Sequence, residues 1–229
     1  MNNLILVRHG QSIWNKEKRF TGWADVDLTA QGMSEAELAG NLIKKLGINF
    51  DICFTSKLKR AVNTLEIILK VLNRPNIDVV KSDLLNERHY GGLTSLNKDE
   101  TIQKYGAKQV QVWRRSFDIP PPPMDSNNPY KDKIKSNILS ESLKDTFNRV
   151  IPFYNDKIKP LVISKKNILV VFHGNSCRSL LKEILNISNE NIIQLEVPTG
   201  NPLQIIFDTN LELKKINYLD KSREKKIIF

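Results

Sequence analysis

The sequence predicts an α/β protein in which helices cover both faces of a mostly parallel sheet, giving a three-layer α/β/α sandwich. Two unbroken apolar runs, 4–7 and 168–172, show no polar alternation and are typical of strands buried on both faces of a parallel sheet. Stretches with apolar residues at helical spacing lie between the predicted strands. The 229 residues, 40% of them hydrophobic, suffice for one sizeable core, and no repeat or linker divides them. We therefore expect a single domain over residues 1–229.

The other elements follow in chain order. Thr29 is placed to cap a helix whose apolar stripe is Leu38, Leu42, Ile43 and Leu46. Further strands are expected at 51–54, 77–81, 203–207 and 211–218, and further helices from residue 55, from about 98 to 116, and from 140 to 158. Residues 124–139 are polar and without periodicity, so we expect a mobile lid there, and residues 220–229 read as a charged tail.

Both buried runs end in the same pattern, a His-Gly pair followed by a side-chain amide and a serine, in RHGQS and HGNS. Carboxyl ends of neighbouring parallel strands meet at the edge where α/β proteins bind ligands, so His9 and His173 should share one crevice. Gly10 lets the backbone approach a ligand, and Ser12 can cap a helix whose free amides attract an anion. A single histidine at a strand end is more often structural, but the repetition, with Arg8 attached, favours a phosphate site.

Two stretches downstream carry further candidate residues. Arg60 falls in the first turn of a helix, where its side chain leans towards the carboxyl edge of the sheet, although an arginine in this position is more often solvated. Residues 84–92 place Glu87 among an arginine, a histidine and a tyrosine and end in two glycines, which indicates a shaped loop. The alternative there is a surface salt bridge between Glu87 and Arg88.

Adjacent arginines and a short aromatic turn complete the candidates. Adjacent residues such as Arg114 and Arg115 do not share a helix face, so both can reach one ligand only where the helix ends. The proline run 120–123 predicts such an end just after them. Guanidinium groups bind carboxylates and phosphates in bidentate fashion. Thr21 and Gly22 offer a hydroxyl and an amide to a phosphate, or form an ordinary turn.

These motifs resemble a known family. The stretch LVRHGQSIWN closely resembles the signature of the histidine phosphatase superfamily. Five further stretches resemble the cofactor-dependent phosphoglycerate mutases within this superfamily: FTGWADVDLTAQG, LNERHYGGL, LNK, VWRRS and HGNS. The resemblance thus runs from residue 4 to about 219. It implies a phosphoglycerate mutase-like fold and interconversion of 2-phosphoglycerate and 3-phosphoglycerate through a phosphohistidine primed by 2,3-bisphosphoglycerate. One departure is SDL at 82–84, where many members carry Thr-Trp-Arg, which affects the packing behind the next loop.

The resemblance also implies residue roles. His9 would accept the phosphoryl group, Glu87 would transfer a proton, and Arg8, Arg60 and His173 would complete the catalytic set. The implied substrate-binding residues are Arg8, His9, Gly10, Gln11, Ser12, Asn15, Thr21, Gly22, Arg60, Glu87, Arg88, His89, Tyr90, Lys98, Arg114, Arg115, Gly174 and Asn175. We further expect a homo-oligomer, in the first instance a dimer.

Composition narrows the partners. The net charge of +10 is compatible with nucleic acid, a membrane or acidic metabolites as binding partners. The lysines, however, are spread along helices, and only arginines cluster near the motifs. We therefore expect small phosphoglycerates as partners, and neither nucleic acid nor membrane. Cys53 and Cys177 are far apart and predict free thiols in a reducing compartment. A start that leads directly into a strand leaves no signal peptide, and no run could span a bilayer, which favours the cytoplasm. An arginine precedes both His9 and His89 and would repel a cation, so we expect no metal.

Other functions stay open at this point. With water as the acceptor the same chemistry gives a phosphatase, and a bisphosphoglycerate mutase differs only in the acceptor bound. Lys98, Arg114 and Arg115 favour the phosphoglycerate mutase. A non-catalytic anion- or nucleic-acid-binding module would instead carry scattered basic residues without acid/base partners, and its DNA binding would weaken steeply with salt.

Overall fold

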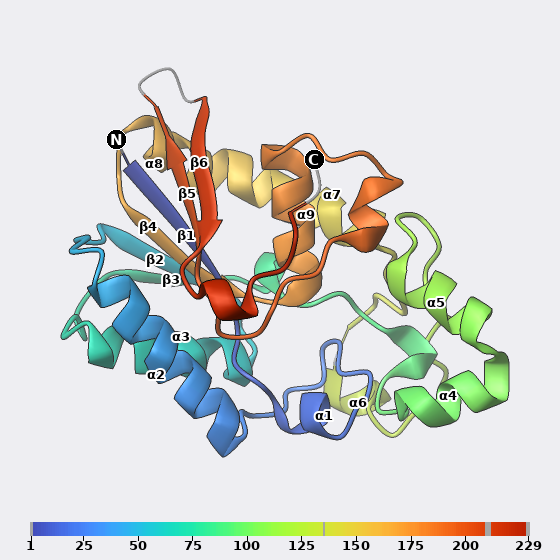
Figure 1. The fold of residues 1–229 in the computed structure, drawn as a ribbon. Helices are drawn as coiled ribbons and strands as arrows, with labels where there is room; N and C mark the ends of the chain where they lie inside the picture. Colours follow the sequence, from blue (N-terminus) through green and yellow to red (C-terminus); the bar gives the residue numbers. More distant parts are fainter. Residues whose placement is uncertain (1, 135, 209–211, 228–229) are drawn as a thin grey trace.

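The computed structural model describes residues 2–134, 136–208 and 212–227 (Figure 1). These residues form a six-stranded sheet in the order β3-β2-β4-β1-β5-β6. Its strands are β1 (Asn2–Arg8), β2 (Ile52–Thr55), β3 (Val79–Lys81), β4 (Ile168–Phe172), β5 (Leu203–Phe207) and β6 (Leu213–Tyr218). The first four pair in parallel, whereas β5 runs antiparallel to both β1 and β6. The predicted mostly parallel sheet is confirmed.

The two His-Gly strands are direct neighbours in the sheet. In their parallel register Leu4 lies opposite Ile168, and Arg8 lies opposite Phe172. All five residues of β4 are buried, as its uninterrupted apolar sequence predicts. Because both strands end at the same level, the residues that follow them meet at one edge of the sheet.

Helices cover both faces of this sheet (Figure 1). One face carries α2 (Ala30–Lys44) and α3 (Lys59–Val71), and the other carries α7 (Leu143–Phe153), α8 (Lys159–Ile163) and α9 (Gly174–Ile184). Alternate strand residues enter different cores: Ile5 and Val7 pack with α2 and α3, while Leu4 and Leu6 pack with α7 and α9. The three-layer prediction is confirmed. Among the described residues, none of the helices has the length and apolar character needed to cross a bilayer.

The predicted apolar stripe of α2 is wrong in part. Its buried residues are Gly32, Ala36, Ala39, Gly40 and Ile43. Leu38, which the periodicity placed in the core, is 43% exposed. The reason is close packing of α2 on α3: a Cβ atom added at Gly40 would lie 2.8 Å from Cβ of Val71. Small residues therefore form this interface, and the larger ones point away from it.

Smaller helices gather beyond the carboxyl edge of the sheet (Figure 1). They are α1 (Ile13–Lys16), α4 (Lys98–Tyr105), α5 (Ala107–Arg115) and α6 (Lys131–Ile134). The single helix expected from about 98 to 116 is two helices, because Gly106 adopts φ +83° between them. Single turns occur at Asp83–Leu85, Gly91–Leu93, Asn191–Gln194 and Lys221–Arg223, and a wider turn at Tyr154–Ile158 joins α7 to α8.

The segment expected to be a lid is anchored at several points. Met124 is buried and its N–H donates to the carbonyl of Leu139. The ring of Tyr130 stands edge-on to that of Trp14, with centroids 4.9 Å apart. Residue 135 lies outside the described residues. The segment is therefore held at Met124 and at Tyr130, which contacts α1, while many of its other described residues are exposed.

The segment expected to be a charged tail lies against the molecule. Arg223 donates to the carbonyl oxygens of Thr199 and Gly200. Ile227, near the end of the described chain, packs against the core on the α7 and α9 side. Residues 228–229 of this predicted tail are outside the described part.

Candidate active site

His9 and His173 lie side by side at the ends of β1 and β4. Their ring centroids are 5.0 Å apart in an edge-to-face arrangement. His9 Nδ1 donates to the carbonyl of Gly10 at 2.7 Å, which leaves Nε2 as the unprotonated ring nitrogen. His173 Nε2 shares a hydrogen bond of 2.7 Å with Ser56 Oγ. The two rings that the His-Gly patterns placed together are therefore neighbours, although only His9 lines a chamber among the described residues.

Burial, together with the charges of two nearby arginines, keeps both imidazoles neutral. Arg60 is 1% exposed, and its Nε donates to His9 Nε2 over 3.3 Å. The remaining guanidinium nitrogens of Arg60 donate to the carbonyls of Gly22 and Ala24 at 2.7 and 2.9 Å. Burial lowers the pKa of His9 well below 6.5, and the charges of Arg60 and Arg8 lower it further. Burial likewise lowers the pKa of His173, so both rings are neutral at neutral pH.

Two chambers, which share four of the described residues in their linings, lie beside this pair. The inner chamber, of about 60 Å³, is lined by Arg8, His9, Asn15, Arg19, Phe20, Thr21, Gly22, Arg60, Glu87, Tyr90 and Lys98. The outer chamber, of about 550 Å³, shares Arg8, Glu87, Tyr90 and Lys98 with it. These four residues lie where the two chambers meet, and we call this position the passage.

Glu87 stands at that passage with its carboxylate held by main-chain donors. It is 8% exposed, and its Oε1 accepts the N–H groups of Arg88 at 2.8 Å and of Asn175 at 3.1 Å. Asn175 belongs to the first turn of α9, whose dipole favours a carboxylate at this point. A Cβ added at Gly174 would come within 3.7 Å of Glu87 Oε2. The second oxygen therefore faces the space kept by this glycine.

Tyr90 and Lys98 also line both chambers. Burial alone would raise the pKa of Tyr90, but Arg88, which it also hydrogen bonds, and Lys98 lower it to about 8. The Arg88 guanidinium carbon lies 4.7 Å from the Tyr90 ring centroid. Burial lowers the pKa of Lys98, and Arg114 and Arg8 lower it further while Tyr90 opposes the shift. The passage thus concentrates positive charge next to one polarised hydroxyl.

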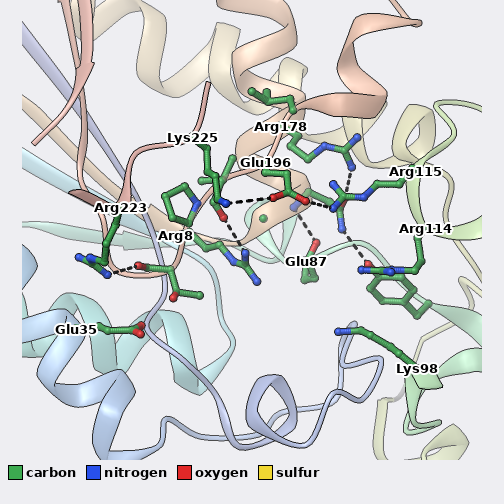
Figure 2. A pocket seen from close by; sticks show the side chains of 17 residues that line it. Arg8, Glu35, Glu87, Lys98, Arg114, Arg115, Arg178, Glu196, Arg223 and Lys225 are labelled. Atoms are coloured by element: carbon green, nitrogen blue, oxygen red, sulfur yellow. Dashed lines mark hydrogen bonds and ion pairs between the residues drawn. The ribbon is translucent and has the colours of Figure 1, made fainter. Parts of the chain in front are cut away.

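Positive charge dominates the outer chamber (Figure 2). Among the described residues, its lining includes seven cationic side chains, Arg8, Lys98, Arg114, Arg115, Arg178, Arg223 and Lys225, and three carboxylates, Glu35, Glu87 and Glu196. Arg114 and Arg115 end α5, as the sequence predicts. Glu196 lies between Arg115 at 2.6 Å and Lys225 at 3.9 Å. A chamber of this charge suits a multiply charged anion.

Some predicted site residues lie behind the chamber walls. Among the described residues, neither lining includes Gly10, Gln11, Ser12, Arg88, His89 or His173. The open amides expected after His9 are occupied, because Gly10 N–H donates to Thr64 Oγ1 and Gln11 N–H donates to Glu35. Ser12 caps α1 in a reciprocal pair with Asn15. The short α1 is thus closed by its own cap and offers no anion site of its own.

His89 and Arg88 are buried support for the passage. His89 Nδ1 accepts the N–H of Gly91, and its ring packs edge-on against Trp23. Burial lowers the pKa of His89 to about 4. Arg88 Nη2 donates to the carbonyl of Arg114, which joins the Glu87 loop to the end of α5.

Sequence reasoning missed several lining residues. Arg178 lies three residues after Asn175 on α9 and donates to its Oδ1 at 2.8 Å, so helical spacing from HGNS could have found it. Glu196, Arg223 and Lys225 have no such signal, because they reach the chamber through the folding of irregular segments. Within the described residues, no group of three or more His, Cys, Asp or Glu side chains is placed to hold a metal ion.

Comparison with known proteins identifies the family. The sequence model of the histidine phosphatase superfamily (branch 1) matches residues 4–212. The chain belongs to the histidine phosphatase superfamily. It is 49% identical over 225 residues to a protein of Treponema denticola named 2,3-bisphosphoglycerate-dependent phosphoglycerate mutase, covering 94% of this chain and 91% of that one. A protein of the same name from Pelagibacter ubique is 49% identical over 237 residues, covering 100% and 99%.

Solved structures of other proteins share the fold. A mycobacterial glucosyl-3-phosphoglycerate phosphatase superposes with a TM-score of 0.72 at 21% identity, covering 95% of this chain and 97% of that one. The α-ribazole phosphatase of Shigella flexneri gives a TM-score of 0.70 at 21% identity, covering 95% and 96%. At these identities the likeness concerns the fold alone, and it agrees with the predicted phosphoglycerate mutase-like architecture.

Proposed function

We propose that this histidine phosphatase is a 2,3-bisphosphoglycerate-dependent phosphoglycerate mutase, which interconverts 2-phosphoglycerate and 3-phosphoglycerate. The observation that carries the proposal is the pairing of a neutral histidine in a small inner chamber with a strongly cationic outer chamber. Such a site can hold both charged ends of a phosphoglycerate while only one end reaches His9. The names of relatives at 47–49% identity over nearly the full chain support the same activity.

The residues present fit a bisphosphate primer. Among the described residues that line the inner chamber, buried donors without a hydrogen-bond partner include Nε of Arg8 and Oγ1 of Thr21. An unsatisfied buried donor costs roughly 1–3 kcal/mol, so these groups favour an anionic acceptor. Arg8, Thr21 and Arg60 would hold one phosphate of 2,3-bisphosphoglycerate, and Arg114 and Arg115 would hold the other. When bound, this primer supplies the phosphoryl group that charges the enzyme.

In the proposed mechanism His9 Nε2 is the nucleophile. Burial keeps the ring neutral, and the bond from Nδ1 to Gly10 O fixes the tautomer that presents Nε2. The N–P bond forms in line as the P–O bond of the donor breaks. Arg8 and Arg60, which line the inner chamber, stabilise the charge of the equatorial phosphoryl oxygens without reorganising. His173 contributes from behind, where its ring packs against that of His9.

Glu87 moves the proton in each half-reaction. As the phosphoryl group passes from His9 to a substrate hydroxyl, Glu87 Oε2 takes the hydroxyl proton. It returns that proton to the other oxygen when the second phosphate is transferred back to His9. Since Oε1 already accepts two main-chain N–H groups, the carboxyl keeps one orientation throughout.

The deciding experiment follows 2-phosphoglycerate formation from 3-phosphoglycerate with and without catalytic 2,3-bisphosphoglycerate, while recording phosphate release. A mutase gives bisphosphate-stimulated isomerisation with little phosphate. Phosphate release that equals or exceeds isomerisation would make the chain a phosphatase, and net accumulation of bisphosphate would make it a bisphosphoglycerate mutase. Retention of activity in excess chelator tests the proposal that no metal takes part.

Two further points belong to the proposal. We infer a dimer, supported by β3 at an open edge of the sheet, where Val80 and Leu84 are 37% and 41% exposed. Light scattering on the purified chain tests it, and a monomer would contradict it. We also infer a cytoplasmic location, supported by two free, buried cysteines.

A further inference from the structure

A buried ion pair lies behind the loop that carries Glu87. Arg149 is on α7, and Glu141 immediately precedes the serine that caps this helix. Nε of Arg149 donates to Oε1 of Glu141 over 2.7 Å, and Nη2 donates to Oε2 over 2.9 Å. The two side chains are 11% and 3% exposed. A bidentate pair of this kind is held in a single orientation.

Arg149 hydrogen bonds to the main chain of the loop that carries Glu87. Its Nη1 donates to the carbonyl oxygens of Leu84 at 2.8 Å and Asn86 at 3.0 Å. Its Nη2 donates to the carbonyl oxygen of Glu87 itself at 2.9 Å. The loop has only single 3₁₀ turns, so its carbonyl groups depend on such partners.

Glu141 and Trp23 fix the same loop from the other side. Glu141 Oε2 accepts the N–H of His89 at 2.8 Å, and Glu141 N–H donates to the carbonyl of His89 at 2.9 Å. Trp23 Nε1 donates to the carbonyl of Glu87, and the Arg149 guanidinium lies 5.6 Å from the Trp23 ring centroid. The peptide groups on both sides of Glu87 are thereby fixed.

The pair supports the site without touching it. Among the described residues that line the two chambers, neither Glu141 nor Arg149 appears. Removing one partner of a buried ion pair leaves the other charge unpaired, and it also frees the main-chain groups that the pair holds. The consequence for Glu87 is displacement of the carboxyl relative to the substrate oxygen.

We propose that Glu141 and Arg149 are positioning residues that aim the Glu87 carboxyl for its proton transfer. The proposal rests on the proposed function, in which Glu87 moves that proton. A displacement on the order of 1 Å at a reacting group costs up to about 10²-fold in rate. Arg149→Gln should therefore lower the mutase kcat about tenfold to a hundredfold, with KM nearly unchanged because the substrate-binding cations lie elsewhere.

A change of leaving group separates positioning from general structural damage. Phosphorylation of His9 by 2,3-bisphosphoglycerate expels a basic alkoxide that needs the proton from Glu87, whereas p-nitrophenyl phosphate expels a stable phenolate that does not. Single-turnover phosphorylation of Arg149→Gln should slow with the bisphosphate and stay near the wild-type rate with p-nitrophenyl phosphate. Glu87→Gln should give the same pattern. Equal losses with both donors, or a loss with neither, overturn the positioning role.

A double-variant cycle gives an independent reading. If Arg149 acts only through Glu87, adding Arg149→Gln to Glu87→Gln should lower the mutase kcat no further, whereas multiplied losses would contradict the proposal. Arg149→Lys, which keeps the charge but not the fork of donors, should recover stability more than kcat. Arg74→Gln is the matched control, because Arg74 also donates to a loop carbonyl, that of Phe50, but lies away from the site. A wild-type chain that fails to isomerise phosphoglycerate refutes the proposed function instead, which keeps the two failures distinct.

Discussion

The inner and outer chambers differ in that the outer one contains an exposed ion pair between two side chains. In the inner chamber the reactive groups are fixed by main-chain atoms: His9 by the Gly10 carbonyl, and Arg60 by the carbonyls of Gly22 and Ala24. In the outer chamber Arg178 and Arg223 also donate to main-chain carbonyls, but Arg115 is held by a side chain, that of Glu196, 81 residues away. The inner chamber is therefore set before substrate arrives, whereas the outer chamber can exchange an internal ion pair for the ligand.

The largest expected effect tests the inner chamber. His9→Ala removes the proposed nucleophile, so mutase activity should fall on the order of 10⁴-fold or more. Labelled 2,3-bisphosphoglycerate should leave an acid-labile, alkali-stable adduct on wild type and none on the variant. An adduct of undiminished yield would move the nucleophile to another residue. An unchanged unfolding temperature would show that the variant is still folded.

The next effect concerns the passage between the chambers. Glu87→Gln keeps the shape of the side chain but cannot carry the proton, so kcat should drop about 10²–10⁴-fold while KM changes little. Steady-state kinetics in both directions of the mutase reaction measure the split. A near-normal kcat would show that the proton travels by another group, with Tyr90, whose pKa is lowered to about 8, as the first to examine.

The same contrast explains what the sequence could predict. The inner chamber follows two buried strands, so the apolar runs before His9 and His173 and the parallel register place both rings in advance. The outer chamber depends on tertiary contacts between irregular segments, and nothing local places Glu196 or Arg223 beside α5. Periodicity also misjudged α2, because it favours large apolar residues, whereas close helix packing selected Gly40 and its small neighbours.

A third prediction uses the closed character of the inner site. Because burial lowers the pKa of all three histidines, their rings should stay neutral below pH 6.5 in the folded chain, with His89 titrating at about 4. Below pH 6.5 the unfolded chain then binds more protons than the folded chain, so the free energy of unfolding falls as the pH falls. For His89 alone this decrease reaches about 3 kcal/mol and levels off near the folded pKa of about 4.

Ring chemical shifts and denaturant unfolding across this range measure both effects. His89→Asn keeps an acceptor for the Gly91 N–H and should flatten the pH dependence. Titration of His9 near 6.5 would show that water reaches the ring and that the inner chamber is not closed.

The smallest expected effect tests the exchangeable outer chamber. Glu196, whose side chain is 50% exposed, pairs with Arg115, whose side chain is 21% exposed. Its carboxylate therefore lies where an anionic group of the substrate would bind Arg115. Exposed pairs contribute about 0–1 kcal/mol, so Glu196→Gln should lower KM by about two- to fivefold without changing kcat, and this decrease in KM should shrink at high salt.

Arg115→Gln should instead raise KM, because it removes the cation that binds the substrate, whereas Glu196→Gln removes the carboxylate that competes with the substrate. Glu66→Gln removes an exposed carboxylate of α3 that pairs with Lys81 of β3 and is not among the described residues that line the two chambers, so it should leave KM unchanged. If KM rises in Glu196→Gln, Glu196 orders the chamber for substrate instead of competing with it, and the outer chamber is then as fixed as the inner one.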